Sequence, residues 1–141
     1  MKYPATLTRS EEDDEDIYVV RFRDIPEAIT QGRGKGGATL MAEDALMTAL
    51  DFYFEDNRLI PMPSLPQEGE VMINLPASAF IKVLLLNTML EERVTQSMLA
   101  KRMGVKPQQV TRLVNLKHTT KIDNLACAFK ALGRELIINV A

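Results

Sequence analysis

Apolar and polar residues alternate near the start of the chain in the manner of β-strands. The alternation covers residues 3–8 and 17–23, and an unbroken acidic run at residues 11–16 separates the two segments. Adjacent carboxylates repel one another, so the acidic run is typical of a solvated turn. The pattern therefore predicts a β-hairpin. The side chains expected to face the core are Tyr18, Val20 and Phe22.

The pattern changes twice more before the middle of the chain. A short third strand is predicted at residues 28–31, and the glycine-rich residues 32–37 are interpreted as a flexible hinge. Apolar residues with helical spacing predict a helix over residues 39–56, and residues 71–75 predict a further strand. The expected order is βββαβ, a small sheet with one helix.

From residue 77 onward the spacing of apolar residues is helical. Helices are predicted over residues 77–92 and 122–132, and the apolar residues 136–140 predict a terminal strand. The predicted domains are residues 1–76 and residues 77–141. The fold class is therefore α+β: the βββαβ domain, followed by an all-α domain with a terminal strand.

Residues 95–114 predict two short helices joined by a tight turn. Thr95 is suited to cap the first helix, because its side chain can accept a hydrogen bond from a free amide. Ala100 leaves room for a crossing helix, Gly104 suits a turn with positive φ, and Pro107 suits the first position of the second helix. Together these features are typical of a helix-turn-helix, whose second helix enters the major groove of DNA.

The polar face of this segment supplies the candidate DNA-binding residues. Gln and Arg can contact adenine and guanine edges through two hydrogen bonds, and Lys neutralises phosphates. The candidates are Gln96, Lys106, Gln108, Gln109, Thr111, Arg112, Lys117 and Lys121.

The net charge of −2 conceals a sharp asymmetry along the chain. Residues 1–92 contain 8 Lys/Arg and 17 Asp/Glu, a net charge of −9, whereas residues 93–141 contain 9 and 2, a net charge of +7. The basic part suits a polyanion, and the acidic part suits a cationic partner or simply solvent. The two parts are therefore expected to have different partners.

Cellular location is constrained by three further observations. The start of the chain has no apolar signal-peptide stretch, and the longest apolar run, residues 80–86, is interrupted by Lys82. The single cysteine, Cys127, excludes an internal disulfide and is interpreted as a packing residue. We expect no membrane association and a cytoplasmic, nucleoid-associated location.

Several separate motifs along the chain match one known protein family. The N-terminal segments are KYPATL (2–7), YVVRF (18–22), DIPEAITQG (24–32), AEDAL (42–46), DFYFEDN (51–57) and LIP (59–61). With them the chain resembles the HicB-type antitoxins of bacterial toxin–antitoxin pairs over nearly its whole length. Residues 95–114, with TRL (111–113) and TKID (120–123), resemble the subgroup that has a C-terminal helix-turn-helix domain, while residues 33–37 depart from the family's usual polar start of the helix.

The resemblance implies a partial ribonuclease-H-like fold without nuclease activity in the N-terminal domain. That domain would bind and block a small basic mRNA-cleaving toxin, HicA, and the C-terminal domain would bind operator DNA and repress the pair's own operon. Because one helix-turn-helix covers one half-site, a homodimer or tetramer is expected, with residues 136–140 as a candidate for strand exchange.

No catalysis, cofactor or metal is expected. The first strand contains no carboxylate for a nuclease site, residues 32–37 lack the ending of a phosphate-binding loop, and His118 has no triad partner beside it. Two alternatives remain open at this point: a regulator whose N-terminal domain senses a small molecule, and a degenerate nuclease-like enzyme.

Overall fold

The computed structural model describes residues 1–11 and 16–141. Most of the predicted acidic turn, residues 12–15, lies outside the described residues. The chain divides into two compact units. Unit 1 consists of Met1–Tyr53 and Ile60–Pro76, and unit 2 of Phe54–Leu59 and Ala77–Ala141.

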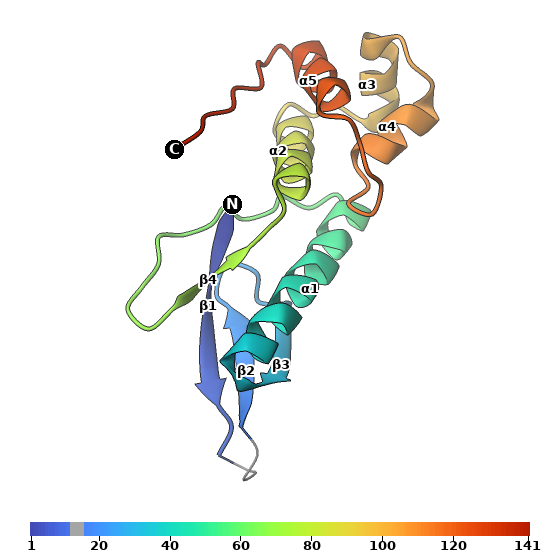
Figure 1. Ribbon diagram of the computed structural model, residues 1–141. Coiled ribbons are helices and arrows are strands. Elements are labelled where there is room, and N and C mark those ends of the chain that lie inside the picture. Colours follow the sequence, from blue (N-terminus) through green and yellow to red (C-terminus); the bar gives the residue numbers. More distant parts are fainter. Residues whose placement is uncertain (12–15) are drawn as a thin grey trace. The chain divides into compact units, whose positions relative to one another are not determined.

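Unit 1 contains a four-stranded antiparallel sheet in the order β3-β2-β1-β4 (Figure 1). The pairing of β1 with β2 confirms the predicted hairpin, and the order βββαβ is confirmed as well. The strands are β1 (Lys2–Arg9), β2 (Ile17–Phe22), β3 (Ile29–Arg33) and β4 (Val71–Asn74).

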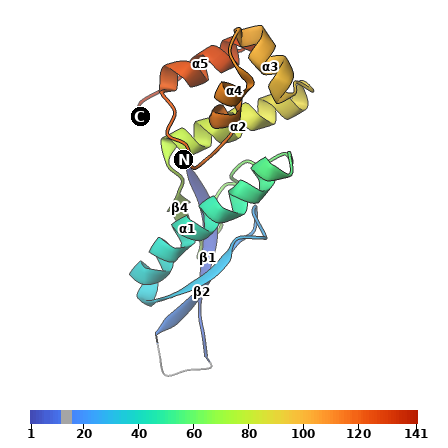
Figure 2. The ribbon, with the colours of Figure 1, turned by 90° about the vertical axis from the view of Figure 1, so that its right-hand side faces the viewer.

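One face of this sheet is covered by α1 (Gly34–Glu55) (Figure 2). Val20 and Phe22 are buried, which confirms the predicted core face of β2, while Tyr18 on the same face is half-buried. Burial of such side chains is the main favourable term in folding this unit. The fully buried residues of the sheet and helix include Tyr3, Val20, Ile73, Ala42, Leu46 and Leu50.

The predicted flexible hinge at residues 32–37 is wrong. Gly32 belongs to β3, and Gly34 is already the first residue of α1, with a φ of 68°. A Cβ placed on Gly32 would lie 2.6 Å from the backbone nitrogen of Ala38. The glycine therefore permits a close approach of strand and helix rather than mobility.

Replacing Gly32 by Ala is expected to destabilise the fold by about 2–4 kcal/mol, because the three atoms nearest the added methyl group are backbone atoms that cannot rotate away. Gly36→Ala is the matched control: its Cβ would meet nothing within 4 Å, and alanine favours the helix by about 0.5–1 kcal/mol. Urea unfolding of the two variants measures both effects. Equal midpoints for the two would contradict the close-approach explanation.

Unit 2 is a bundle of four helices around one apolar core. Figures 1 and 2 show α3, α4 and α5 gathered over α2. The helices are α2 (Ala77–Glu91), α3 (Gln96–Met103), α4 (Pro107–Leu113) and α5 (Ile122–Ala131). The core includes Leu85, Met89, Leu99, Val110, Leu113, Leu125, Ala128 and Phe129. The mixed α+β class is thus confirmed.

The predicted terminal strand at residues 136–140 is wrong for a single copy of the chain. Residues 134–141 form no helix or strand, and Ile137 and Val140 are 71% and 95% exposed. A strand needs a neighbouring strand edge to receive its hydrogen bonds. Unit 2, every residue of which is described, contains only helices and connections, so it offers no such edge.

Two side chains are exposed although their helical spacing predicts a core position, Cys127 as stated above and Met98 in the same way. Cys127 on α5 is exposed, and Met98 on α3 is 43% exposed. The buried face of α5 is formed by Leu125, Ala128 and Phe129. In both cases the helix period was correct, but the neighbouring residues form the buried stripe.

Candidate functional site

The connection between α3 and α4 has the local geometry that its residues predict. The Thr95 side chain accepts a hydrogen bond from the Met98 amide at 3.2 Å, and so caps α3. Gly104 has a φ of 68° and ends α3 in the left-handed conformation that glycine adopts without steric penalty. Pro107 is the first residue of α4. The predicted cap, turn and helix start are confirmed.

The two helices pack through their apolar sides. Ala100 and Leu99 of α3 are buried, as are Val110 and Leu113 of α4. Because Ala100 is small, the backbones of α3 and α4 can lie close together, as predicted. The packing directs the polar side of α4 to solvent.

The predicted site residues lie on this polar side and in the connections beside it. All are exposed except Gln96, which is half-buried at the start of α3. Thr111 on α4 donates to the Gln96 Oε1 atom at 3.3 Å and to the Pro107 carbonyl at 3.2 Å, so the structure brings Gln96 against the second helix. The exposed members are Lys106, Gln108, Gln109, Thr111, Arg112, Lys117 and Lys121.

Lys82 on α2 is an important residue of this region that the sequence analysis missed. Its side chain is buried, with only 2% of the residue exposed. The Nζ atom donates to three backbone carbonyls, those of Arg112 at 3.1 Å, Asn115 at 2.7 Å and His118 at 2.5 Å. The only signal in the sequence was a lysine inside an apolar run.

The three carbonyls lie where α4 ends and the chain turns toward α5. The last carbonyls of a helix lack intrahelical partners and are the negative end of its dipole. The Lys82 ammonium donates to one such carbonyl, that of Arg112, and to two carbonyls of the turn after α4. Burial lowers the pKa of this lysine. Lys82 therefore fixes the end of α4 and the segment after it to α2.

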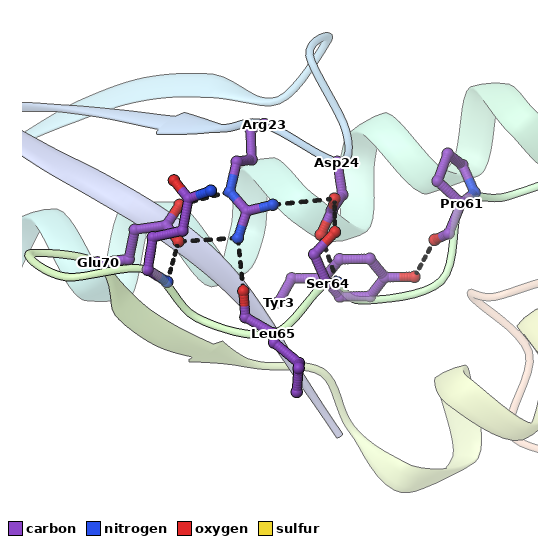
Figure 3. Close-up of polar contacts among 8 residues, drawn as sticks. Tyr3, Arg23, Asp24, Pro61, Ser64, Leu65 and Glu70 are labelled. Carbon is purple, nitrogen blue, oxygen red and sulfur yellow. Dashed lines mark hydrogen bonds and ion pairs between the residues drawn. The ribbon is translucent and has the colours of Figure 1, made fainter.

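A polar network in unit 1 holds the proline-rich connection that precedes β4. The Tyr3 hydroxyl donates to the Pro61 carbonyl at 2.8 Å (Figure 3). The Asp24 carboxylate accepts hydrogen bonds from the Ser64 amide at 2.8 Å and from its hydroxyl at 2.5 Å. Burial, with the negative charge of Asp24 next in importance, raises the pKa of Tyr3, so its hydroxyl remains a donor.

A second part of the network joins Arg23 to Glu70 through two hydrogen bonds of 2.9 Å each. Arg23 also donates to the Leu65 carbonyl at 2.7 Å (Figure 3). The hydrogen bond from Arg23 is the main cause that lowers the pKa of Glu70, and the hydrogen bond from the Gln67 amide adds to it. This contact is present at neutral pH and is lost as the pH falls through the lowered pKa of Glu70. Both carboxylates, of Asp24 and Glu70, therefore serve the fold.

Two further observations bear on chemistry and location. Among residues 1–11 and 16–141, no three His, Cys, Asp or Glu side chains gather as a metal site would require. Within the same ranges, every helix is too short or too polar to cross a lipid bilayer.

Comparison with known proteins defines the class: an antitoxin of a bacterial toxin–antitoxin system. Residues 2–84 match the family model described as the HicB-like antitoxin of such systems. Antitoxin HicB of Escherichia coli K12 is 52% identical over 136 residues, which cover 96% of each chain. Antitoxin HicB 2 of Photorhabdus laumondii is 50% identical, with 96% of this chain and 94% of that protein covered. The chain belongs to the HicB-like antitoxin family.

A less similar relative also matches a longer part of this chain than the family model does. Antitoxin HicB of Pseudomonas fluorescens is 42% identical over 118 residues, covering 83% of this chain and 81% of that protein. The matches to the E. coli and Photorhabdus relatives cover 96% of this chain, so the similarity includes unit 2 and is not confined to the sheet.

Proposed function

We propose that this antitoxin binds two partners, a small basic toxin of the HicA type through unit 1 and the operator of its own operon through unit 2. The observation that supports the proposal most strongly is the α3–α4 pair, because its cap, turn and packing direct a polar, cationic helix to solvent. The proposed mechanism is occlusion by binding, without covalent chemistry. Operator binding would place the protein at the nucleoid in the cytoplasm.

The charge of the first part of the chain supports the toxin contact. Residues 1–92 have a net charge of −9, which attracts a cationic protein and accelerates encounter. The toxin-blocking role would require that unit 1 covers the surface with which the toxin binds mRNA. The antitoxin role of the family is consistent with this partner.

For the DNA contact, α4 is proposed as the recognition helix. Gln108, Gln109, Thr111 and Arg112 would contact base edges in the major groove, where Gln and Arg discriminate bases through paired hydrogen bonds. The hydrogen bond from Thr111 to Gln96 would orient both side chains at this surface. Lys106, Lys117 and Lys121 would neutralise phosphates and set affinity rather than sequence preference.

A homodimer or tetramer is proposed because one recognition helix covers only one half-site. Residues 134–141 are extended and expose apolar side chains, as in Ile137, Ile138 and Val140. Exchange of this segment between subunits would supply the strand edge that a single copy of unit 2 lacks.

The proposal is tested by co-purification of the full chain with the product of the neighbouring short, basic reading frame. Tagged full-length protein should retain that product through salt washes and should retard operator DNA in a gel. Gly36→Ala, which alters no proposed contact, is the matched variant and should behave like the wild type. Failure to retain any neighbouring product would exclude the toxin role, and failure to retard operator DNA would exclude the repressor role.

A further inference from the structure

Unit 2 contains a cavity of about 850 Å³ between α4 and α5. One wall is formed by Gln109 and Arg112 of α4, and the opposite wall by Asn124, Cys127 and Lys130 of α5. The last turn of α3 and residues 118–121 complete the lining. We call this cavity the α4–α5 hollow.

The charge of the α4–α5 hollow has a single sign. Its lining includes four Lys or Arg side chains and no carboxylate. Its floor is partly apolar, from residues such as Leu113 and Ala131. A concave surface with cations on several walls concentrates the electrostatic field and favours a polyanion. The cations are Arg102, Arg112, Lys121 and Lys130.

The hollow is continuous with the proposed recognition surface, because Gln109 and Arg112 belong to both. A duplex contacted by α4 must pass a sugar–phosphate strand along one side of that helix. The strand brings one negative charge about every 3.4 Å, which suits cations distributed on both walls. Asn124 can donate to a phosphate oxygen, as Asn side chains commonly do at DNA backbones.

We propose that the α4–α5 hollow holds one sugar–phosphate strand of the operator DNA, with Lys130, Asn124 and Arg102 as additional backbone contacts. The proposal rests on the proposed operator binding and extends it to α5. Asn124 and Lys130 of α5 were not among the expected DNA contacts, whereas the sequence already predicts that Arg102, beside the helical pair, neutralises phosphates. Their role is to set affinity and register rather than to read bases.

The chain contains a natural probe of this surface. Cys127 is the only cysteine, it is exposed, and it lines the hollow. The rate at which iodoacetamide alkylates Cys127 in the full-length protein can be measured by mass spectrometry, free and with saturating operator duplex. We expect the duplex to slow alkylation at least fivefold.

A second measurement distinguishes direct contact of DNA with the hollow from indirect protection of Cys127. Lys130→Gln should weaken binding to operator and unrelated duplexes alike, by about 3- to 10-fold at 0.1 M salt, and should reduce the slope of log Kd against log salt by about 0.9. Arg93→Gln removes the same charge at an exposed residue that does not line the hollow. It should leave the slope unchanged.

Three results would overturn the inference. If Lys130→Gln leaves affinity and slope unchanged and Cys127 remains unprotected while Arg112→Ala loses operator binding, the hollow holds no DNA but the proposed function stands. If the wild-type protein binds no duplex at all, both fail. If a poly-glutamate peptide protects Cys127 and duplex DNA does not, the hollow binds an acidic protein segment instead.

Discussion

Replacing Lys82 by Met is expected to lower the stability of unit 2 by about 2–4 kcal/mol, because a hydrogen bond to a charged group contributes about 1.5–3 kcal/mol and Lys82 makes three. Met has a similar length but donates no hydrogen bond, so the carbonyls of Arg112, Asn115 and His118 would lose their shared donor. Urea unfolding should show a midpoint well below that of the wild type.

The expected loss of stability is the difference between two opposing effects, the hydrogen bonds that are lost and the desolvation cost that is removed. Removing a buried charge also removes its desolvation cost, and some buried ion pairs are replaced by apolar residues without loss. Here only the donor is removed, while its three acceptors stay in place at the end of α4 and in the turn that follows. The Arg112 and Asn115 carbonyls keep longer hydrogen bonds from the Asn115 and His118 amides, at 3.3 and 3.2 Å, so the largest loss falls on the His118 carbonyl. The free energy lost with the three hydrogen bonds to the ammonium should exceed the desolvation free energy that is recovered.

The control is Lys101→Met, the same substitution at an exposed position of α3. A surface change of this kind is expected to shift stability by no more than about 0.5 kcal/mol. Amide exchange of residues 112–118 should accelerate in Lys82→Met and not in the control. An unfolding midpoint for Lys82→Met equal to that of the wild type would contradict the role given to this lysine.

The double substitution of Arg112 and Gln109 by Ala is expected to remove preference for the operator over unrelated DNA. Each base contact through paired hydrogen bonds contributes about 1–3 kcal/mol of discrimination, so losing both should cost about 2–6 kcal/mol, at least about 30-fold in the ratio of the two affinities. Lys82 bonds the backbone carbonyl of Arg112, which Ala retains, so the helix end should stay fixed. Fluorescence anisotropy with operator and scrambled duplexes measures the ratio.

Lys106→Ala is the contrasting variant for the same experiment. It should weaken binding to both duplexes by a similar factor and reduce the salt slope by about 0.9, because a phosphate contact holds no sequence information. If Arg112, Gln109 and Lys106 can all be replaced while operator binding stays intact, α4 is not the recognition helix.

The parts of the structure that were predictable from sequence depend on neighbouring residues. Thr95, Gly104 and Pro107 each act within a few positions of themselves, through a cap, a left-handed turn and a fixed φ. The alternation in β2 likewise records which face is buried, as Val20 and Phe22 show. Local chemistry of this kind can be recognised in a single sequence.

The features that escaped prediction depend on distant partners. Gly32 resembled a hinge residue, because only the folded backbone reveals how close Ala38 lies. Lys82 interrupted an apolar run, and its three acceptors lie at least 30 positions away along the chain. Residues 136–140 have a strand-like composition but lack a strand edge within unit 2. In each case the missing information was tertiary contact.

The charge asymmetry and the two units together support an account in which capture of a toxin and control of transcription reside in one chain. Residues 93–141, with a net charge of +7, lie wholly within unit 2. An antitoxin that binds DNA through one unit leaves the other available to its toxin. Whether the two events strengthen or weaken each other would appear as a shift in operator affinity when toxin is added.

Neutralisation of the proposed HicA-type toxin is tested by RNA cleavage. The product of the neighbouring short, basic reading frame is purified and incubated with an mRNA substrate, while the full-length antitoxin is titrated into the reaction. Cleavage should fall in proportion to added antitoxin and stop near one antitoxin chain per toxin. Undiminished cleavage in the presence of a large molar excess of folded antitoxin would contradict the proposed neutralisation.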